Sequence, residues 1–440
     1  MHAVRRFMKV AILRADWLTA GRARAYCEIF GLFGWATFLL MLLLPWWKTG
    51  WNAQPRFGDF ISFWAASDQV LNGHVVAVYN TTKHHIAELA AFPKMSFGNF
   101  AFFYPPTFLL TCTPLALLPY GVSASLWLGT ASVAYVSALR RILPWRWALI
   151  PILAFPGFVI DFTNGQNGLL TAALLGWSMM LMRQRPFVAG LCLGCLVIKP
   201  QLLVAAPVIL LCTRQWRTIA GGIVSGGGLI VASWIAFGTV AWSGFFRMGH
   251  SARVTFEMGY VSFWKMQSVF TAVRLLHGNV SLAYVLQTTT TVFVFFLVGW
   301  LSWRMNLKNG NGSFAGDCAP EIALMIAALP FCTPFLLDYD LACLAFPMAW
   351  LFIQGRSTEW LPGEKIILFL AYIYLLGARL FGMATLVCPT PFIASALLLA
   401  IARRMAPAEC AHAISGFKYA IRERSIFVRK RQVSVSGEKA

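Results

Sequence analysis

Residues 57–79 read FGDFISFWAASDQVLNGHVVAVY, a polar and aromatic stretch within a chain that is otherwise almost continuously apolar. After Asp59, apolar side chains recur at helical spacing and form one face of a short helix, namely Phe60, Phe63, Trp64, Val70 and Leu71. The opposite face is polar and carries Ser62, Ser67, Asp68 and Gln69. Asn72 and Gly73 supply a signal that ends the helix. A short amphipathic helix directly after an apolar segment belongs in the headgroup layer at the outer face of a membrane, where it would hold the Asp59 carboxylate over a site.

The composition indicates an all-α polytopic membrane protein. Of its 440 residues, 59% are hydrophobic and only 12% are charged. Apolar runs such as 30–47 and 219–237 approach the roughly 20 residues that a helix needs to cross a bilayer. We count about 12 transmembrane helices between residues 28 and 402. Two long segments, 48–103 and the polar loop 238–279, are expected outside the membrane on the same face. The first is expected to contain a second short helix, at about 81–91.

The net charge of +20 does not indicate nucleic-acid binding, because Lys and Arg gather at the ends of apolar segments and in two basic tails. Such clusters are typical of the cytoplasmic ends of membrane segments. They place residues 1–27 and 403–440 in the cytoplasm, and the second tail has a composition that attracts anionic lipid headgroups. Membrane lipids are therefore expected partners, and nucleic acid is not.

The middle of the chain has two possible topologies. If every apolar segment crosses once, the basic residues at 140–146 and 183–185 fall outside, against the positive-inside tendency. They fall inside if one segment between 104 and 139 is re-entrant and if 187–212 is two short segments that meet at Lys199. We prefer the simple count, because it keeps 238–279 outside and both tails inside.

Polar residues within or beside membrane segments are costly to bury and are therefore candidates for a functional site. They form four groups: Asp59 with Asp68, Asp161 with Asn164 and Gln166, Lys199 with Gln201, and Asp338 with Asp340. The second outer segment adds the cations Arg247, His250, Arg253 and Lys265. By our count the first and last acidic groups share the outer face with these cations.

Carboxylates opposed by cations at a lipid surface suit the transfer of a sugar from a lipid-phosphate donor. The cations would bind the phosphate, and Asp59 would act as general base toward an acceptor hydroxyl. Substrate hydroxyls would be bound by the remaining candidates, Asp68, Tyr104, Gln166, Lys199, Asp338 and Asp340. The DxD spacing of Asp338 and Asp340 is too short a motif to indicate a metal, so we predict neither a metal nor another cofactor.

Each candidate also has a purely structural interpretation. Asp59 at the start of a helix suits an N-cap, Asp68 a solvated face, and Lys199 a side chain that snorkels to an interface. The pair Asp338 and Asp340 suits a hydrated turn between helices, and His250 and Arg253 suit a solvated loop. His74, His84 and His85 have no acidic partner at ligand spacing and are expected at the surface. The cysteines lie mostly within apolar runs and are interpreted as small hydrophobic residues.

A transporter or flippase of a lipid-linked or small polar solute is the alternative function. Such proteins carry their essential charges near the middle of the bilayer, with access from both sides. Here the acidic residues lie at the ends of segments and on one face, which favours an enzyme.

Seven short motifs occur in an order that resembles glycosyltransferase family 87 over roughly residues 28–400. They are Gly58-Asp59-Phe60, Asn72-Gly73 with Tyr79, Tyr104-Pro105-Pro106, Asn164-Gly165-Gln166, Ala189-Gly190 leading to Lys199-Pro200, Trp264-Lys265-Met266-Gln267-Ser268, and Thr333-Pro334 ending in Asp338-Tyr339-Asp340. The chain is similar in particular to the α-mannosyltransferases that use polyprenyl-phosphate mannose.

This resemblance implies a membrane fold of the C type, with periplasmic juxtamembrane helices in the first outer segment. It implies a bacterial inner (plasma) membrane enzyme whose site faces the periplasm. The donor would be a polyprenyl-phosphate hexose, typically mannose, and the acceptor a lipid or glycan hydroxyl. Transfer would invert the anomeric centre without a metal. The general base of the family is an acidic residue in the first outer segment, and its position here is Asp59.

One motif departs from the family pattern. In the mycobacterial mannosyltransferase branch, the stretch after Thr333-Pro334 would end in a His-His pair, whereas this chain has Tyr339-Asp340 preceded by Asp338. Carboxylates in place of imidazoles leave the identity of the sugar and of the acceptor open.

Overall fold

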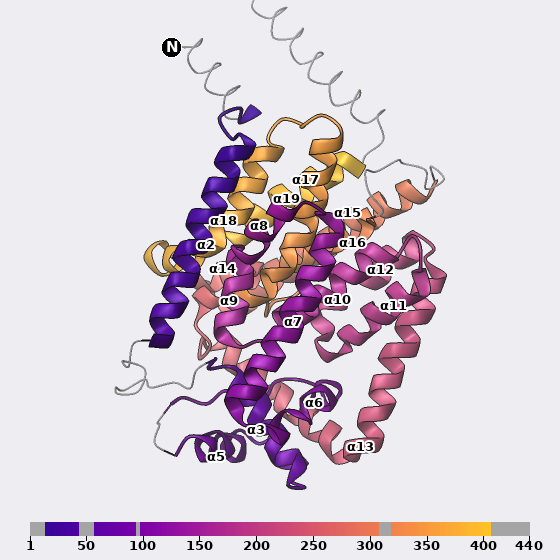
Figure 1. The fold of residues 1–440 in the computed structure, drawn as a ribbon. Helices are drawn as coiled ribbons and strands as arrows, with labels where there is room; N and C mark the ends of the chain where they lie inside the picture. Colours follow the sequence, from indigo (N-terminus) through magenta and orange to yellow (C-terminus); the bar gives the residue numbers. More distant parts are fainter. Residues whose placement is uncertain (1–13, 44–56, 94–96, 308–317, 406–440) are drawn as a thin grey trace, which may run out of the picture.

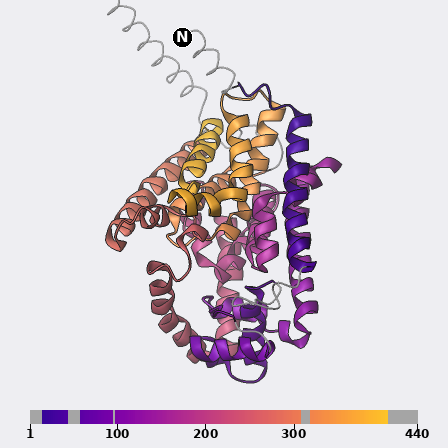
Figure 2. The same cartoon turned by 90° about the vertical axis from the view of Figure 1, so that its left-hand side faces the viewer.

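The computed structural model describes residues 14–43, 57–93, 97–307 and 318–405, and within these ranges the chain is almost entirely helical. One isolated antiparallel bridge joins Met266 and Leu337. The helices form an elongated bundle with a group of short helices at one end, and Figures 1 and 2 show this group opposite the end at which the described residues begin. The predicted all-α class is confirmed.

The group at one end, called here the end cluster, comprises α3 (Phe60–Leu71), α4 (Val75–Val78), α5 (Thr81–Ala91) and α6 (Pro106–Cys112). The bundle comprises α2 (Ala20–Leu43), α7 (Tyr120–Ile142), α8 (Leu149–Leu153), α9 (Pro156–Asn164), α10 (Gly168–Leu181), α11 (Pro186–Cys195), α12 (Ala206–Cys212), α13 (Trp216–Glu257), α14 (Val269–Leu275), α15 (Val280–Leu307), α16 (Pro320–Cys332), α17 (Ala345–Ser357), α18 (Glu364–Thr385) and α19 (Thr390–Met405). Short 3-10 turns connect them: η2 (Leu115–Leu117), η3 (Arg146–Ala148), η4 (Leu196–Ile198), η5 (Pro200–Leu203), η6 (Phe263–Lys265) and η7 (Asp338–Leu344).

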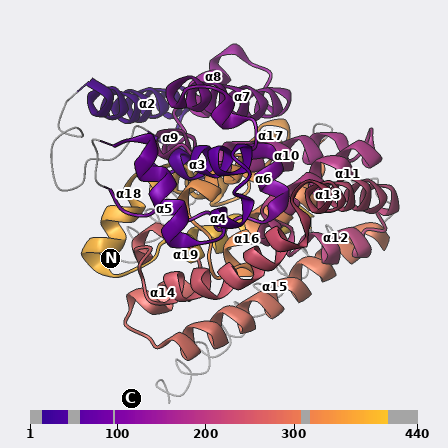
Figure 3. The ribbon, with the colours of Figure 1, turned by 90° about the horizontal axis from the view of Figure 1, so that it is seen from below.

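The core lies around α16, in which every residue is buried. Figure 3 shows this helix near the middle of the molecule, between α10, α15 and α19. Its sequence, PEIALMIAALPFC, is apolar on all sides, as expected for a helix that other helices surround completely.

Four helices, α7, α13, α15 and α18, are long and apolar enough to cross a membrane. The bent pair formed by residues 146–153 and 156–164 makes a fifth if the two count as one span. The protein is therefore a multi-pass membrane protein. The described residues do not reproduce the predicted number of about 12 full-length spans, because several of the expected crossings are apolar helices of fewer than 18 residues.

The segment after Tyr104 shows why the simple count overestimates the crossings. Pro106 begins α6, as suits proline at the start of a helix, but α6 is only seven residues long, about 10 Å at 1.5 Å per residue. This is too short to span the roughly 30 Å hydrocarbon layer. The structure thus matches the re-entrant alternative for this segment. The basic last turn of α7 then falls at the same end as the first described residues, and Leu139, Leu143 and Asp16 line one common cavity there.

The predicted segment 187–212 is likewise broken, into α11 and α12 with the turns η4 and η5 between them at Lys199. The segment 238–279, predicted as a polar loop, is mostly helical. Gly238 has φ 69° and ψ 177°, which interrupts the helical geometry within α13, but the helix then continues to Glu257. This second part packs on α4 and α6 of the end cluster. Because its apolar face has a protein partner, the segment folds as a helix rather than as a loop.

The end cluster differs from the sequence prediction in what covers α3. The helix has the predicted bounds and ends at Asn72, and α5 spans the expected residues. The polar face of α3 is not solvated, however, because Ser62, Ser67 and Gln69 are buried. Gln69 and Ser62 contact the ring of His84, at 2.8 and 3.3 Å.

His84 was expected at the surface but is fully buried, and Glu88, one turn later in α5, is buried beside it. His85 Nδ1 lies 3.0 Å from Glu88 Oε2, and the same oxygen accepts a hydrogen bond from the Phe100 backbone N–H. Burial lowers the pKa of His84 to about 3. The ring is therefore neutral, and α5 packs over α3 as a lid held by polar contacts.

Close backbone packing joins α11 to α13. Both helices carry glycine at the contact, and a Cβ added at Gly221 would collide with the Phe187 carbonyl oxygen and lie 3.0 Å from the Leu191 amide nitrogen. Small residues allow such close approach between helices in a membrane. Gly228, two turns further along α13, has open space around it.

We therefore expect Gly221→Ala to destabilise the protein, by about 1–3 kcal/mol as in other overpacked sites. The matched control Gly228→Ala should be neutral or stabilising by up to about 1 kcal/mol, because alanine favours helix. Thermal unfolding of both purified variants in detergent measures the difference. Equal melting temperatures would contradict the proposed contact.

Candidate functional site

Asp59 directs its carboxylate away from the helix that it precedes. Its Oδ2 accepts a hydrogen bond from Gln166 Nε2 at 2.8 Å. Asp59 itself has helical backbone angles, and its side chain makes no capping hydrogen bond to α3. The interpretation of Asp59 as a mere N-cap is therefore wrong, and the side chain is held instead by the polar break between α9 and α10.

This break is shaped by Gly165, which adopts the left-handed conformation with φ 76° at the end of α9. A Cβ at this position would lie 2.8 Å from Phe57 Cβ and 2.9 Å from Phe60 Cβ, so glycine is required for α3 to approach. The Asn164 carbonyl then accepts the Asp59 backbone N–H at 3.0 Å. Two stretches about a hundred residues apart in the chain are joined at this point.

Gln166 is the centre of the local hydrogen-bond network. Its amide donates to Asp59, its Oε1 accepts from the Tyr104 hydroxyl at 3.0 Å, and its backbone carbonyl accepts from Trp127 Nε1 at 3.2 Å. With both ends of its amide engaged, Gln166 fixes the orientation of the Asp59 carboxylate.

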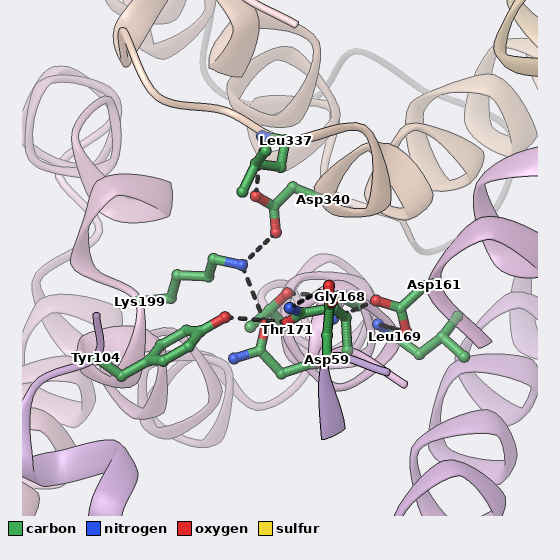
Figure 4. A network of polar contacts seen from close by, with 11 residues as sticks. Asp59, Tyr104, Asp161, Gly168, Leu169, Thr171, Lys199, Leu337 and Asp340 are labelled. Carbon is green, nitrogen blue, oxygen red and sulfur yellow. Dashed lines mark hydrogen bonds and ion pairs between the residues drawn. The ribbon is translucent and has the colours of Figure 1, made fainter. Parts of the chain in front are cut away.

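Asp161 has a structural task in the same break. Its two carboxylate oxygens accept the backbone N–H groups of Gly168 and Leu169 at 2.7 and 3.0 Å. These donors belong to the first turn of α10, where no helical partner exists. Asp161 thus starts α10 and holds the break in place (Figure 4).

Lys199 forms a buried ion pair with Asp340. Its Nζ lies 2.5 Å from Asp340 Oδ1 and 3.1 Å from Asn167 Oδ1, and it is only 3% exposed. The ammonium also lies over the Tyr339 ring, 4.8 Å from the centroid, and 5.7 Å from that of Tyr104. Figure 4 shows Lys199 reaching across from one side of the network to Asp340 on the other. Lys199 is therefore enclosed and does not snorkel to an interface.

Asp338 binds Arg379, a residue of α18 that the sequence reasoning missed. The guanidinium donates through Nε to Oδ2 and through Nη2 to Oδ1, the second contact at 3.0 Å. Asp338 is buried, whereas the Arg379 side chain remains 34% exposed. The sequence did contain an indication of this residue, because an arginine inside the apolar run 365–380 is costly unless it has a partner.

Lys265 is the exposed last residue of η6. The strap that follows it, residues 266–268, is buried and pairs with the segment before Asp338. The Gln267 backbone N–H donates to the Leu336 carbonyl at 2.7 Å, and the Ser268 hydroxyl donates to the Pro334 carbonyl at 2.6 Å. The two motifs that the sequence analysis noted at 264–268 and 333–340 are therefore neighbours in space.

The electrostatics of Asp59 reflect these neighbours. Partial burial raises the pKa of its carboxyl, and the Gln166 hydrogen bond together with the charges of Lys265 and Arg379 lowers it part of the way back. Asp338 adds a smaller raising effect. The net shift is upward, so the group is a stronger base than an ordinary aspartate.

The structure thus brings together seven of the predicted site residues, Asp59, Tyr104, Gln166, Lys199, Lys265, Asp338 and Asp340. Asp68 lies elsewhere, more than two turns along α3 from Asp59, where it accepts a hydrogen bond from Asn72. Arg247 and His250 are exposed on α13. Arg253 pairs with Glu257 at 2.6 Å and lies over the Tyr284 ring.

We expect the Lys199–Asp340 pair to support the structure of the site. Lys199→Met leaves a buried carboxylate without its partner and should cost about 3–5 kcal/mol, whereas the double variant Lys199→Met with Asp340→Leu should recover most of this loss. Thermal unfolding in detergent tests both. If the single variant were as stable as the parent protein, the ion pair would not have the structural role assigned to it.

The comparisons with known proteins give one match. Residues 102–330, just over half of the chain, match the model of glycosyltransferase family 87. No curated protein and no solved structure matches the chain. The matched range begins before Tyr104 and includes the break at Gln166, Lys199 and Lys265, while Asp59 and the segment 338–340 lie outside it.

Proposed function

The chain belongs to glycosyltransferase family 87, a family of C-type membrane glycosyltransferases, and we propose that it moves a hexose from a polyprenyl-phosphate donor to an acceptor hydroxyl. Mannose is the first candidate for the sugar, and a lipid or glycan is the acceptor. The observation that carries the proposal is a hydrogen-bonded carboxylate, Asp59, that shares its site with two accessible cations, Lys265 and Arg379. This combination supplies a base for the acceptor and a counter-charge for the departing phosphate.

Asp59 is the proposed general base. It takes the proton of the acceptor hydroxyl as that oxygen bonds to the anomeric carbon and the bond from this carbon to the phosphate oxygen breaks. The electron pair leaves with polyprenyl phosphate, and attack from the opposite face inverts the centre. A raised pKa increases the driving force for proton transfer, and Gln166 keeps the carboxylate oriented.

Lys265 and Arg379 are proposed to bind the phosphate. Arg379 is held at two points by Asp338, which orients its planar guanidinium while leaving it about one-third exposed. Lys265 is exposed at the end of η6. Of the four cations expected from the sequence, Lys265 is therefore favoured, and Arg247, His250 and Arg253 on α13 form a second candidate set.

The remaining polar groups are proposed to shape the sugar subsite. Tyr104 and Gln166 border Asp59 directly, and the Lys199–Asp340 pair places Tyr339 and Asp338 beside them. Asp68 is proposed only for a more distant part of the acceptor.

The orientation in the membrane follows from the distribution of basic residues. The end of the bundle opposite the end cluster carries Arg24, Arg356 and Lys365 around one cavity, and such ends face the cytoplasm. The site near α3 would then face the periplasm of a bacterial inner membrane. The end cluster would be the juxtamembrane part of the C-type fold.

Asp59→Asn should abolish most of the transfer without unfolding the protein. Loss of a general base typically costs a factor of about 10²–10⁴. Purified protein with radiolabelled polyprenyl-phosphate mannose and a membrane lipid extract provides the assay, and the exposed carboxylate variant Glu359→Gln is the control. Turnover by Asp59→Asn at the parent rate would exclude the base assignment, and the same assay with polyprenyl-phosphate glucose or arabinose tests the sugar.

The pH profile should depend on Gln166. Transfer requires deprotonated Asp59, so the rate falls as pH drops through the raised pKa of this carboxyl. Gln166→Met removes the hydrogen bond that favours the charged form of Asp59. The acid limb of the pH–rate profile should therefore move to higher pH. Tyr104→Phe removes the other side-chain contact of Gln166 but keeps the bond to Asp59 and should shift the limb little. An unmoved limb in Gln166→Met would show that another group controls it.

Arg379→Met should weaken donor binding with less effect on turnover at saturation. A charge-assisted contact contributes about 1.5–3 kcal/mol, so the KM for the donor should rise at least about tenfold. Arg253→Met is the comparison, because its guanidinium is engaged with Glu257 and Tyr284. A large increase in KM for Arg253→Met with none for Arg379→Met would assign the phosphate to α13.

A further inference from the structure

A cavity lies at the opposite end of the bundle from Asp59. It has a volume of about 690 Å³ and is bordered by α2, α8, α17 and α18. We propose that this cavity binds one anionic phospholipid of the cytoplasmic leaflet, with the phosphate near Arg356 and Lys365 and an acyl chain in the apolar interior. This binding site is separate from the transferase site and does not depend on the sugar or the acceptor.

The interior of the cavity is apolar and aromatic. Phe30 of α2, Phe155 after α8, Phe352 of α17 and Phe369 of α18 all face it. Its volume lies in the range of roughly 300–1,000 Å³ that is typical of ligand sites. An apolar interior of this kind binds hydrocarbon and offers water few partners.

Cations border the same cavity. Arg24, Arg356 and Lys365 line it, against a single acidic residue in the lining, Asp16. Arg24 pairs with Glu28 at 2.8 Å, and Lys365 lies 3.9 Å from Asp16, whose side chain is 74% exposed. Arg356 is exposed and lies over the Trp145 ring, 4.6 Å from the centroid, and within the described part of the chain no ion pair joins it to a carboxylate. The positive excess complements an anionic headgroup.

The tryptophans in the lining place the cavity at the depth of the lipid headgroups. Trp147 and Trp360 belong to its lining, and tryptophan gathers at the interface between headgroups and hydrocarbon. Basic pockets between helices on the cytoplasmic side recognise anionic lipids. A free phosphate would use the cations but leave the apolar interior empty, so the structure favours a phospholipid.

The helix that would gain most from an occupant is α2. Trp17, just before α2, and Tyr26, in its second turn, each pack on the ring of Phe369. Further along, Trp35 Nε1 donates to the Leu153 carbonyl at 3.0 Å. Between these contacts Ala23 and Cys27 face the cavity, so an acyl chain there would complete the packing of α2 on α18.

The experiment uses the purified full-length protein in detergent. Native mass spectrometry measures the dissociation constants of phosphatidylglycerol and of phosphatidylcholine with the same acyl chains. A phosphatidylglycerol that carries a photoreactive group in one acyl chain then locates the site by peptide mapping. We expect phosphatidylglycerol to bind more tightly and to label α2 and α18.

Two kinds of variant test the assignment. Arg356→Gln and Lys365→Gln should each weaken phosphatidylglycerol about fivefold, the effect of one cation at a membrane surface. Arg304→Gln is the matched control, because Arg304 also lies over a tryptophan ring, that of Trp300, but outside this cavity. Ala23→Trp fills the cavity without removing charge and should lose binding of the labelled lipid. Size-exclusion elution at the parent volume establishes that each variant is folded.

Three outcomes would overturn the proposal. They are equal affinity for the two lipids, unchanged affinity in both charge variants, and labelling confined to segments outside α2, α8, α17 and α18. Displacement of the lipid by millimolar inorganic phosphate would also count against it, since it would mark a phosphate site instead. Sugar transfer by Asp59→Asn does not enter into any of these measurements, so the two proposals fail independently.

Discussion

The buried ion pair between Lys199 and Asp340 is the constraint on which the other features of the site depend. A charge inside an apolar bundle is costly, and it is tolerated where a partner and further hydrogen bonds compensate it. Here the partners come from two irregular segments, one between α11 and α12 and one between α16 and α17. Asn167 and the Tyr339 ring complete the surroundings of the ammonium. The pair therefore joins three parts of the chain that local sequence cannot bring together.

Irregular backbone at membrane depth survives only where protein groups or a polar cavity satisfy it. Several irregular segments meet around the site, and contacts between them satisfy backbone groups that their helices leave unpaired. Asp161 satisfies the first turn of α10, the Asn164 carbonyl accepts the Asp59 amide, and the strap at Gln267 pairs with the Leu336 carbonyl. The irregular segments lie together because each offers a hydrogen-bond donor or acceptor to an unpaired backbone group of another. A polar site within an otherwise apolar protein is the result.

The two ends of the bundle have opposite chemistry, which suits a membrane enzyme that works on one face. The Asp59 end is a hydrogen-bonded network in which Lys199 pairs with Asp340 and Arg379 with Asp338. The other end combines tryptophan, arginine and lysine around an apolar cavity. In our two proposals, the first end carries out the sugar transfer and the second binds an anionic lipid.

The sequence by itself determined the all-α membrane class, the bounds of α3 and α5, and most of the polar residues that meet in the site. Helical periodicity, caps and the cost of intramembrane charge are local signals, so they can be read without a fold. Tertiary structure decided what these signals could not: that α6 is too short to cross, that residues 239–257 continue as helix, and that the polar face of α3 is covered by His84 of α5. It also decided that Asp59 binds Gln166 instead of capping its own helix, and that Arg379 enters the site. The physical reason is the same in each case, because the free energy of a polar or charged group depends on the partner that meets it, and those partners lie tens to hundreds of residues away in the chain.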